Sequence, residues 1–456
     1  MKIAVVGESA SGLLAALKLA QRGAEVNLFE EHGLNSGEKR LKRLLIITSQ
    51  IAEEEAIKEI GLFQDESLVR NRIGCFELLA NGSIARIEFR QPDLVIERED
   101  LFQVLRKKAR SAGVKFFYRH RFRSFVSFFP GEEYFSAEEI RNQRNHRPSA
   151  SARNNPENRN NALKRERQNE KGKKSLSRYA GPGMKEIAGS KNFVHRLYFL
   201  VEDVAAAREK ICDADVVIGA DGYRSAVRRS LGLGPVRSLF LTQAIIPLPP
   251  EYPADVTRIW FLPEETPYFF WLIPESREKG VLGLIGEEKE AARSALRKFL
   301  ARLKFSAQAI EEGWVPCFEE RFPFKKKING GKVYLIGDAA AQVKMTTMGG
   351  IYSGLMGGIA AAHDILKDHS RRRLEQRGRQ LRLELLAHKW VRKILHAFNS
   401  DDYGRLLSLL NEPARNLLAR VSRDNLTRLL LGLVLRCPRI ALLVAKIYLK
   451  RKLFQF

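Results

Sequence analysis

The stretch that decides the fold is KIAVVGESASGLL, which runs from Lys2 to Leu14. Its apolar start predicts a buried strand over Lys2–Val6, and the pattern that follows predicts a helix over Leu13–Arg22. Glu25–Phe29 then has the composition of a second strand. A strand, a helix and a second strand within thirty residues form the βαβ opening of an α/β protein with a parallel sheet.

The turn inside this unit has the spacing Gly7-x-Ser9-x-x-Gly12, and Glu30 follows Gly12 by 18 residues. Gly7 allows the tight turn, the small Ser9 lets a pyrophosphate approach, and Gly12 allows the helix to pack closely on the strand. The positive end of the helix dipole would face the phosphates, and Glu30 could accept a hydrogen bond from a ribose hydroxyl. Ser9 stands where a second glycine is usual, yet the spacing predicts a dinucleotide site.

Two later segments also place an acidic residue shortly after an apolar run that predicts a strand. The first, VVIGADGYRSAVR at residues 216–228, contains Asp221 and Gly222. The second, VYLIGDAA at residues 333–340, contains Gly337 and Asp338. The carboxyl ends of parallel strands meet at one edge of a sheet, which is where such folds bind ligands.

Taken together, these three motifs resemble the fingerprints of FAD-dependent enzymes of the aromatic-hydroxylase superfamily. The resemblance implies an α/β fold with a Rossmann-like FAD-binding domain, an inserted antiparallel-sheet substrate domain and a helical C-terminal region. It assigns the ADP half of FAD to Gly7, Ser9, Gly12 and Glu30, the neighbourhood of the pyrophosphate to Asp221 and Gly222, and the ribityl chain to Gly337 and Asp338.

The segment after Asp338 separates members of this superfamily. Here it reads KMTTMGGIYSGL at residues 344–355, which is similar to the Lys-x-Thr-Thr-Gly-Gly-Gly-Ile-Tyr-x-Gly-Leu segment of geranylgeranyl reductases. Met348 stands where that family often has glycine. Glycines such as Gly349 and Gly350 let backbone N–H groups approach the pyrimidine edge of a flavin, which is negatively charged when reduced.

Three further features follow from this resemblance. Arg98 matches a family arginine near the flavin, although a solvated charge at a helix start is the alternative. The strand Phe269-Phe270-Trp271-Leu272-Ile273-Pro274 is similar to one that lines the substrate cavity of these reductases, and flavin-dependent halogenases carry a related strand. We therefore take Phe269, Trp271 and Pro274 as cavity residues, with an ordinary core strand as the alternative, and Tyr352 as a candidate proton donor or pocket residue.

One departure from the family bears on the substrate. Many geranylgeranyl reductases carry a Cys-Gly pair about fifteen residues beyond the ribose acid, whereas this chain reads KRLKRLLI at residues 39–46. If that cysteine delivers a proton in the relatives, the proton route or the substrate differs here.

The expected domain boundaries follow the motifs and shifts in composition. Asn81-Gly82 predicts a tight hairpin between strands at 75–79 and 84–89, which marks the start of an inserted antiparallel sheet. We expect a discontinuous FAD-binding domain at 1–65, 91–139, 192–235 and 328–365, a substrate domain at 66–90 and 236–327, a basic insertion at 140–191 and a helical region at 366–456.

Charge is distributed unevenly along the 456 residues, which carry a formal net charge of +25. Residues 141–196 contain 15 basic and 4 acidic side chains, and residues 367–456 contain 21 and 7. These two segments account for the whole excess, so the rest of the chain is near neutral. This distribution argues against a uniformly basic nucleic-acid-binding fold for the body of the protein, and we do not favour nucleic acid as a partner.

The two basic segments suggest different roles. The insertion is rich in Arg, Asn, Ser and Lys with few large apolar residues, which predicts disorder, with an anion-binding arm as the alternative. The C-terminal helices alternate apolar and basic residues. They predict either a subdomain packed on the body or attachment to an anionic membrane surface, and the two can coexist.

The sequence also indicates where in the cell the protein is expected to be found. We expect a cytoplasmic protein, because the four cysteines show no disulfide or zinc spacing and Met1 leads into a strand without a signal-like segment. Peripheral attachment to the inner face of the cell membrane remains open. The apolar stretch at 429–449 is interrupted by four residues that argue against a spanning helix, Arg436, Pro438, Arg439 and Lys446.

The favoured interpretation is an FAD-dependent reductase that transfers hydride from reduced flavin to isoprenoid double bonds of a geranylgeranylated lipid. It needs no metal, and its electron donor is either NAD(P)H or a ferredoxin-like protein. An FAD-dependent monooxygenase or halogenase is the first alternative. A basic flavoprotein that binds lipid or nucleic acid without turnover is the second.

Overall fold

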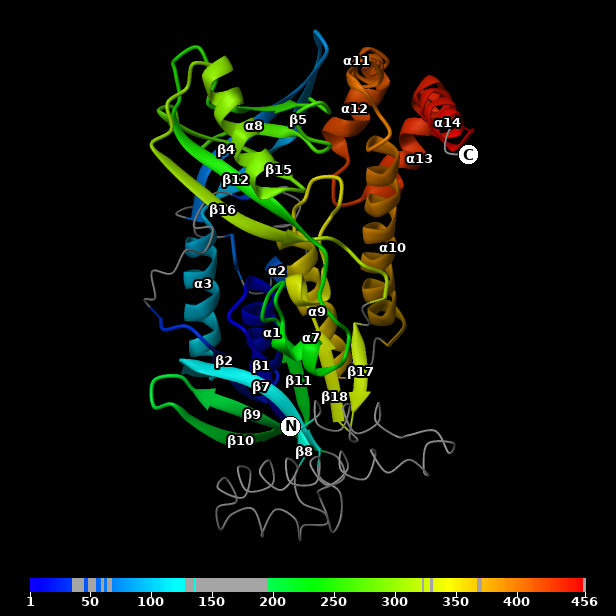
Figure 1. Ribbon diagram of the computed structural model, residues 1–456. Helices are drawn as coiled ribbons and strands as arrows, with labels where there is room; N and C mark the ends of the chain where they lie inside the picture. The colour runs from blue at the N-terminus through cyan, green and yellow to red at the C-terminus, as the bar shows by residue number, and fades with distance from the viewer. Residues whose placement is uncertain are drawn as a thin grey trace, which may run out of the picture.

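The computed structural model describes residues 1–34, 45–47, 55–58, 61–63, 68–127, 135–136, 196–321, 324–328, 331–366 and 371–453. The expected basic insertion at 140–191 and most of the KRLKRLLI segment lie outside these residues. Two large sheets are stacked along the molecule, with a column of C-terminal helices beside them (Figure 1).

The first sheet contains the three sequence motifs and has six strands. Their order is β17 (Lys325–Ile328), β18 (Gly331–Leu335), β11 (Val216–Gly219), β1 (Lys2–Val6), β2 (Glu25–Glu30) and β6 (Lys115–Tyr118). All neighbours are parallel except β17 and β18. Glu30 is the last residue of β2, and Asp221 and Asp338 follow β11 and β18. The motifs predicted that these strands share one sheet, and they lie close together near its centre.

Helices cover one face of this sheet. They are α1 (Ala10–Ala20), α3 (Arg98–Ser111) and α9 (Ile351–Leu366), and they bury a continuous aliphatic core against β1, β2 and β11. α1 begins three residues before the expected Leu13, because Ser9 caps it by accepting the N–H of Gly12 through Oγ at 3.2 Å. A short helix, α2 (Glu55–Lys58), contributes Ile57 to the same core.

A small antiparallel sheet covers the opposite face. Its strands run in the order β10 (Arg208–Ala214), β9 (Leu197–Asp203), β7 (His120–Ser127) and β8 (Phe135–Ser136). Phe29, Phe122 and Phe199 are buried together between the two sheets. The central sheet is therefore buried on both faces, as its apolar strands require.

The second large sheet has eight strands and is antiparallel except where β13 meets β4. Their order is β16 (Ala309–Pro316), β12 (Ser238–Pro247), β15 (Lys279–Gly286), β14 (Phe270–Pro274), β13 (Val256–Trp260), β4 (Val69–Ala80), β5 (Ser83–Ile96) and β3 (Leu45–Ile47). α8 (Lys289–Arg302) packs on one face through an aromatic and aliphatic cluster. The other face packs on the segment Lys344–Gly350 through Trp271, Met345 and Met348.

The predicted hairpin is confirmed and is longer than its sequence pattern indicated. Asn81 and Gly82 have φ of 43° and 74°, as a tight turn of this kind needs. β5 continues to Ile96, beyond the boundary expected at residue 90, because two register shifts keep it paired with β4. β3 pairs with the end of β5, so Leu45–Ile47 belongs to this sheet.

The C-terminal region is helical, as predicted, and packs on the body. Its helices are α10 (Arg371–Leu395), α11 (Ser400–Ser408), α12 (Glu412–Arg420), α13 (Leu426–Arg436) and α14 (Pro438–Leu453). α10 contacts α9, while α11 and α12 contact the long hairpin. Among the described residues, no helix combines the length and hydropathy needed to cross a bilayer. The predicted fold class is confirmed.

A buried arginine joins the second and third motifs. Arg228 of α7 (Ala226–Ser230) is 1% exposed and donates to the carbonyls of Tyr223 and Ala339 at 2.6 and 3.0 Å. Its Nε donates to the carbonyl of Gly234 at 3.1 Å. The planar fork of a guanidinium matches three fixed carbonyls, which an ammonium group cannot do.

We expect Arg228→Met to lower the free energy of unfolding by about 3 kcal/mol, because it leaves these carbonyls buried without donors. Urea unfolding followed by circular dichroism measures the change. Arg229→Met, on the exposed side of the same helix, is the matched control and should cost less than about 1 kcal/mol. Equal losses in both variants would contradict this role.

Candidate functional site

A cavity of about 1190 Å³ lies along the carboxyl ends of β1, β2, β11 and β18. Its wall includes Gly7, Ser9 and Glu30 from the first motif, Asp221 and Gly222 from the second, and Asp338 from the third, together with Arg98. Residues from three distant segments therefore face one space. The volume suits a large ligand.

The glycine turn is fixed by close contacts. Gly7 has φ of +98°, and a Cβ there would lie 2.5 Å from the carbonyl oxygen of Ala220. A Cβ on Gly12 would lie 2.5 Å from the carbonyl oxygen of Gly7. Gly12 thus packs behind the turn, while the N-terminus of α1 is directed at the cavity, where an anion would be stabilised.

Glu30 is held in place at one end of the cavity. Its carboxylate accepts the backbone N–H groups of Glu8 and His32 at 2.8 and 3.1 Å, and the side chain is 5% exposed. The predicted ribose acid is therefore oriented before any ligand binds.

A second acid sits inside the glycine turn itself. Glu8 is 4% exposed and bonds to Arg106 of α3, with 2.6 Å between Nε and Oε1. The hydroxyl of Tyr118 donates to the same carboxylate at 3.0 Å, and burial beside this charge raises the pKa of Tyr118 to about 12. Arg106 neutralises a carboxylate that would otherwise repel phosphate.

Asp221 starts the turn that leads into α7. Its Oδ2 accepts the N–H groups of Ala226 and Val227 at 2.6 and 3.1 Å. Its Oδ1 is buried and has no hydrogen-bond partner among the described residues. Burial raises the pKa of Asp221. Gly222 beside it has φ of +76°, with open space where a Cβ would point.

Asp338 lies at the other end of the cavity. Burial raises the pKa of its carboxyl group, and the charge of Arg98 opposes that shift. Arg98 also lies over the ring of Phe102, 5.2 Å from the centroid. A Cβ on Gly350 would lie 3.2 Å from Asp338 Oδ1, and one on Gly337 would lie 2.4 Å from Ser11 Oγ. The structure thus brings Arg98, Asp338 and Gly350 together.

The Lys344–Gly350 segment forms a tight loop beside this acid. Lys344 and Gly349 are bridged through their backbones, with 3.1 Å from Lys344 N to Gly349 O. Met348 has φ of +55°, the region that glycine adopts at no steric cost, which explains why a glycine suits this position. Its side chain is buried with Phe269 and Trp271.

Residues of the C-terminal helices hold this loop from behind. Lys344 forms an ion pair with Asp424, and both side chains are largely buried. Thr346 Oγ1 lies 2.5 Å from Nδ1 of His388. Arg392 is 3% exposed and donates to the carbonyls of Met345 and Thr346 at 2.9 and 2.6 Å.

The predicted cavity residues occupy different places. Phe269 and Trp271 pack against Met345 and Met348, and the ring of Trp271 fills the space above Gly283. Pro274 ends β14, and its carbonyl accepts the Asn71 amide at 3.0 Å.

Tyr352 lines a separate pocket of about 230 Å³ behind the loop, shared with Lys344, His388 and Asp424. Lys344 Nζ lies 5.7 Å from the centre of its ring. The structure therefore does not bring Tyr352 to the wall of the large cavity.

Known structures resemble the chain over nearly its whole length. A geranylgeranyl bacteriochlorophyll reductase-like protein from Thermoplasma acidophilum superposes with a TM-score of 0.67, covering 98% of each chain at 15% identity. The flavin-dependent brominase Bmp2 gives a TM-score of 0.61 at 14% identity, covering 100% of this chain and 99% of its own. The flavin-dependent halogenase CmlS gives 0.56 at 15% identity, covering 94% and 69%.

Sequence similarity to curated proteins is partial. An uncharacterised protein of Methanocaldococcus jannaschii is 27% identical over 158 residues, which are 33% of this chain and 40% of that protein. The chloroplastic geranylgeranyl diphosphate reductase of Oryza sativa is 25% identical over 197 residues, or 41% of each chain. The chain thus matches less than half the length of these relatives. No family model matches it.

The cavity residues fit FAD. The α1 N-terminus and Ser9 suit a pyrophosphate, Glu30 suits a ribose, and Asp338 with Arg98 suits a polar chain that ends at a flavin. The unpartnered Asp221 Oδ1 is a further polar group in the cavity wall.

Several site residues were not identified from the sequence. Glu312, Gly313 and Trp314 of β16 line the cavity, and Glu8 with Arg106 lies beneath the turn. An acidic residue such as Glu8 inside a turn that would bind phosphate is a signal for a basic partner, but nothing in the spacing selects Arg106 among 78 Lys and Arg residues. No signal pointed to His388 or Arg392.

Lowering the pH should reduce the stability of the folded protein because of His388, which packs behind the Lys344–Gly350 loop. Burial, aided by Lys344, lowers its pKa from 6.5 to about 3, so the folded protein keeps this histidine neutral. Below pH 6.5 the unfolded chain takes up the proton first, and stability falls as the pH drops. We expect His388→Gln to make the acid limb of stability against pH shallower by about 1 kcal/mol per pH unit.

Urea unfolding between pH 7.5 and 4.5 measures this slope in both proteins. His396, whose pKa burial lowers to about 4, provides a second variant, His396→Gln, with the same expected direction. Identical slopes in all three proteins would show that neither histidine is held neutral.

Proposed function

We propose that this protein is an FAD-dependent reductase that acts on isoprenoid double bonds of a geranylgeranylated lipid. The observation that carries the proposal is the convergence of Arg98 and Asp338 with the Lys344–Gly350 loop, at the end of a cavity that begins at Gly7 and Glu30. The similarity of fold to reductase and halogenase structures supports the coarser class.

In this proposal the chain holds the cofactor at both ends. The N-terminus of α1 and Ser9 bind the pyrophosphate, Glu30 binds the adenosine ribose, and Asp338 accepts from the ribityl hydroxyls. Bound and reduced, FAD supplies a hydride equivalent to a carbon–carbon double bond. Arg98 keeps positive charge near Asp338 at this end of the cavity.

The protein's own residues must orient the alkene and exclude water, because an isolated double bond is not activated. The cluster of Phe269, Trp271, Met345 and Met348 is buried against the Lys344–Gly350 loop, and in this proposal it forms the apolar wall of the alkene site. Trp271 Nε1 is buried without a hydrogen-bond partner among the described residues, so this wall also contains one polar donor. A prenyl chain, which is apolar throughout its length, suits such a wall.

The oxygen-using alternative has specific support, since the brominase and the halogenase share the fold at TM-scores of 0.61 and 0.56. The KMTTMGGIYSGL loop favours the reductase, because that segment is the one similar to geranylgeranyl reductases. The proposal includes two alternative electron donors for the flavin, NAD(P)H and a ferredoxin-like protein.

FAD binding should depend on Asp338. We expect Asp338→Ala to weaken the affinity for FAD by about 10- to 100-fold, because a charged acceptor in a cavity contributes about 1.5–3 kcal/mol. Quenching of FAD fluorescence on titration into the apoprotein measures the affinity. The matched control is Asp364→Ala, since Asp364 bonds Lys325 and Tyr334 outside the cavity. An unchanged affinity for FAD in Asp338→Ala would show that Asp338 does not contribute to FAD binding.

Turnover should be reductive and independent of oxygen. We expect anaerobic, chemically reduced protein to add two hydrogens at a time to a geranylgeranylated glycerophospholipid, with reoxidation of the flavin in step. Product mass and flavin absorbance are followed together.

A flavin that stays reduced until air is admitted, with no change in lipid mass, would overturn the lipid assignment. Oxygen-dependent hydroxylation or halogenation of an aromatic compound would then favour the alternative. A protein that binds FAD but shows neither reaction would be left as a flavoprotein without turnover.

A further inference from the structure

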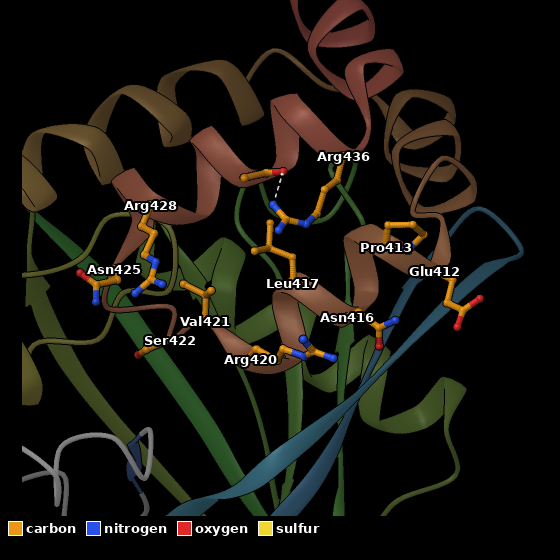
Figure 2. A pocket seen from close by; sticks show the side chains of 11 residues that line it. Glu412, Pro413, Asn416, Leu417, Arg420, Val421, Ser422, Asn425, Arg428 and Arg436 are labelled. Carbon is orange, nitrogen blue, oxygen red and sulfur yellow. Dashed lines mark hydrogen bonds between the residues drawn. The ribbon is translucent and has the colours of Figure 1, made fainter.

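A second large pocket lies in the C-terminal region, away from the flavin cavity. It has a volume of about 810 Å³, is lined by residues of α12 and α13 and of the turn between them, and shares no lining residue with the large cavity (Figure 2). Three arginines line it, Arg420 from α12 and Arg428 and Arg436 from α13. Figure 2 shows Arg428 directed toward Val421 at the end of α12, and Arg436 turned back along α13, where its Nη1 donates to the carbonyl of Gly432 at 3.4 Å.

The chemistry of this pocket suits an anion with several oxygen acceptors. Asn416 and Asn425 add amide groups to the three guanidinium groups. Glu412 is the acidic residue of the lining and lies at one end, away from Arg428 (Figure 2). Guanidinium groups bind phosphate through paired hydrogen bonds, so a phosphate is the natural occupant.

Large apolar side chains are exposed next to these arginines. On α13, Leu431, Val434 and Leu435 are 68%, 52% and 75% exposed. Arg428, Gly432 and Arg436 are spaced four residues apart along one side of the helix and line the pocket, and Leu431 and Leu435 directly precede two of them. An apolar stripe therefore runs beside a basic stripe on the same helix.

α14 repeats the arrangement. Leu442 and Leu449 are 69% and 58% exposed and lie seven residues apart, on one side of the helix. Arg439 and Lys446 are exposed at the same seven-residue spacing, and Leu442 follows Arg439 by three residues. Leucines with basic neighbours on two successive helices are typical of helices that lie in a membrane interface.

We propose that this face, defined by Arg428, Leu431, Leu435, Arg436 and Leu442, docks the protein on an anionic phospholipid bilayer, with a lipid phosphate in the α12–α13 pocket. The leucines enter the boundary between headgroups and acyl chains, while the arginine stems extend so that their charges stay with the phosphates. A surface of uniform negative charge above hydrocarbon complements both stripes at once. The inference goes beyond the proposed reaction and does not depend on it.

The test uses the full chain, loaded with FAD, in flotation with phosphatidylcholine vesicles that contain or lack phosphatidylglycerol. Binding should require the anionic lipid and weaken at high salt. The double variants Arg428→Gln/Arg436→Gln and Leu431→Ser/Leu435→Ser should each lower vesicle affinity by on the order of tenfold. All substituted side chains are exposed, so flavin content and unfolding should match the parent.

The matched control combines Arg297→Gln on α8, which packs on a face of the eight-stranded sheet, with Ile310→Ser on its edge strand β16. These changes remove one exposed charge and one exposed apolar residue away from α13 and α14. It should bind vesicles like the parent. Equal binding by all variants, or equal binding to neutral vesicles, would overturn the proposal.

Three other outcomes would assign the face differently. Binding of inorganic phosphate without binding of vesicles would indicate a free anion, and loss of self-association in Leu431→Ser/Leu435→Ser would indicate a second copy of the chain. Loss of RNA binding in the arginine variant, with vesicle binding unchanged, would indicate a nucleic acid. Each of these measurements is independent of turnover, so failure here and failure of the reductase assignment are distinguishable.

Discussion

The glycine turn before α1 and the first turn of that helix pack closely against two other elements, and the site depends on this packing. A Cβ at Gly7 would meet the carbonyl of Ala220 at 2.5 Å, and one at Gly358 of α9 would meet the carbonyl of Ser11 at 2.6 Å. Strand β11 and helix α9 therefore both reach the backbone of one turn. Because these segments are more than a hundred residues apart, the cavity forms only when the whole chain has assembled around α1.

The sequence predicted those features that arise from local chemistry. A glycine turn between strand and helix, and acids after apolar strands, have a physical reason that is visible in spacing, so the motifs alone placed Glu30, Asp221 and Asp338 on one sheet. Pairings between distant charges have no such signal. Arg106 beneath Glu8, and Arg392 behind Thr346, were two basic residues among 78. Which residues of the C-terminal helices are buried also depends on the elements that these helices pack against, and the sequence of the helices alone does not show this.

The basic C-terminal region contacts the body of the protein through buried charged side chains. Arg392 is buried among carbonyls, Arg423 forms an ion pair with Asp93 of β5, and Asp424 pairs with Lys344. These inward contacts fix the Lys344–Gly350 loop and join the helices to the eight-stranded sheet. On α13 and α14, Leu431, Leu435, Leu442 and Leu449 are instead exposed, which makes them available to a surface. One region thus combines support of the site with exposed charge.

The dependence of the loop on α10 and Asp424 has a consequence for synthesis. Both sheets and α9 are complete once the ribosome has passed Leu366, since their strands all precede that residue. The loop, however, gains its partners His388, Arg392 and Asp424 only as the last part of the chain emerges. Domains generally fold as they are made. The glycine turn and both large sheets can therefore form before the last helices emerge, while the end of the cavity beside Asp338 is completed only afterwards.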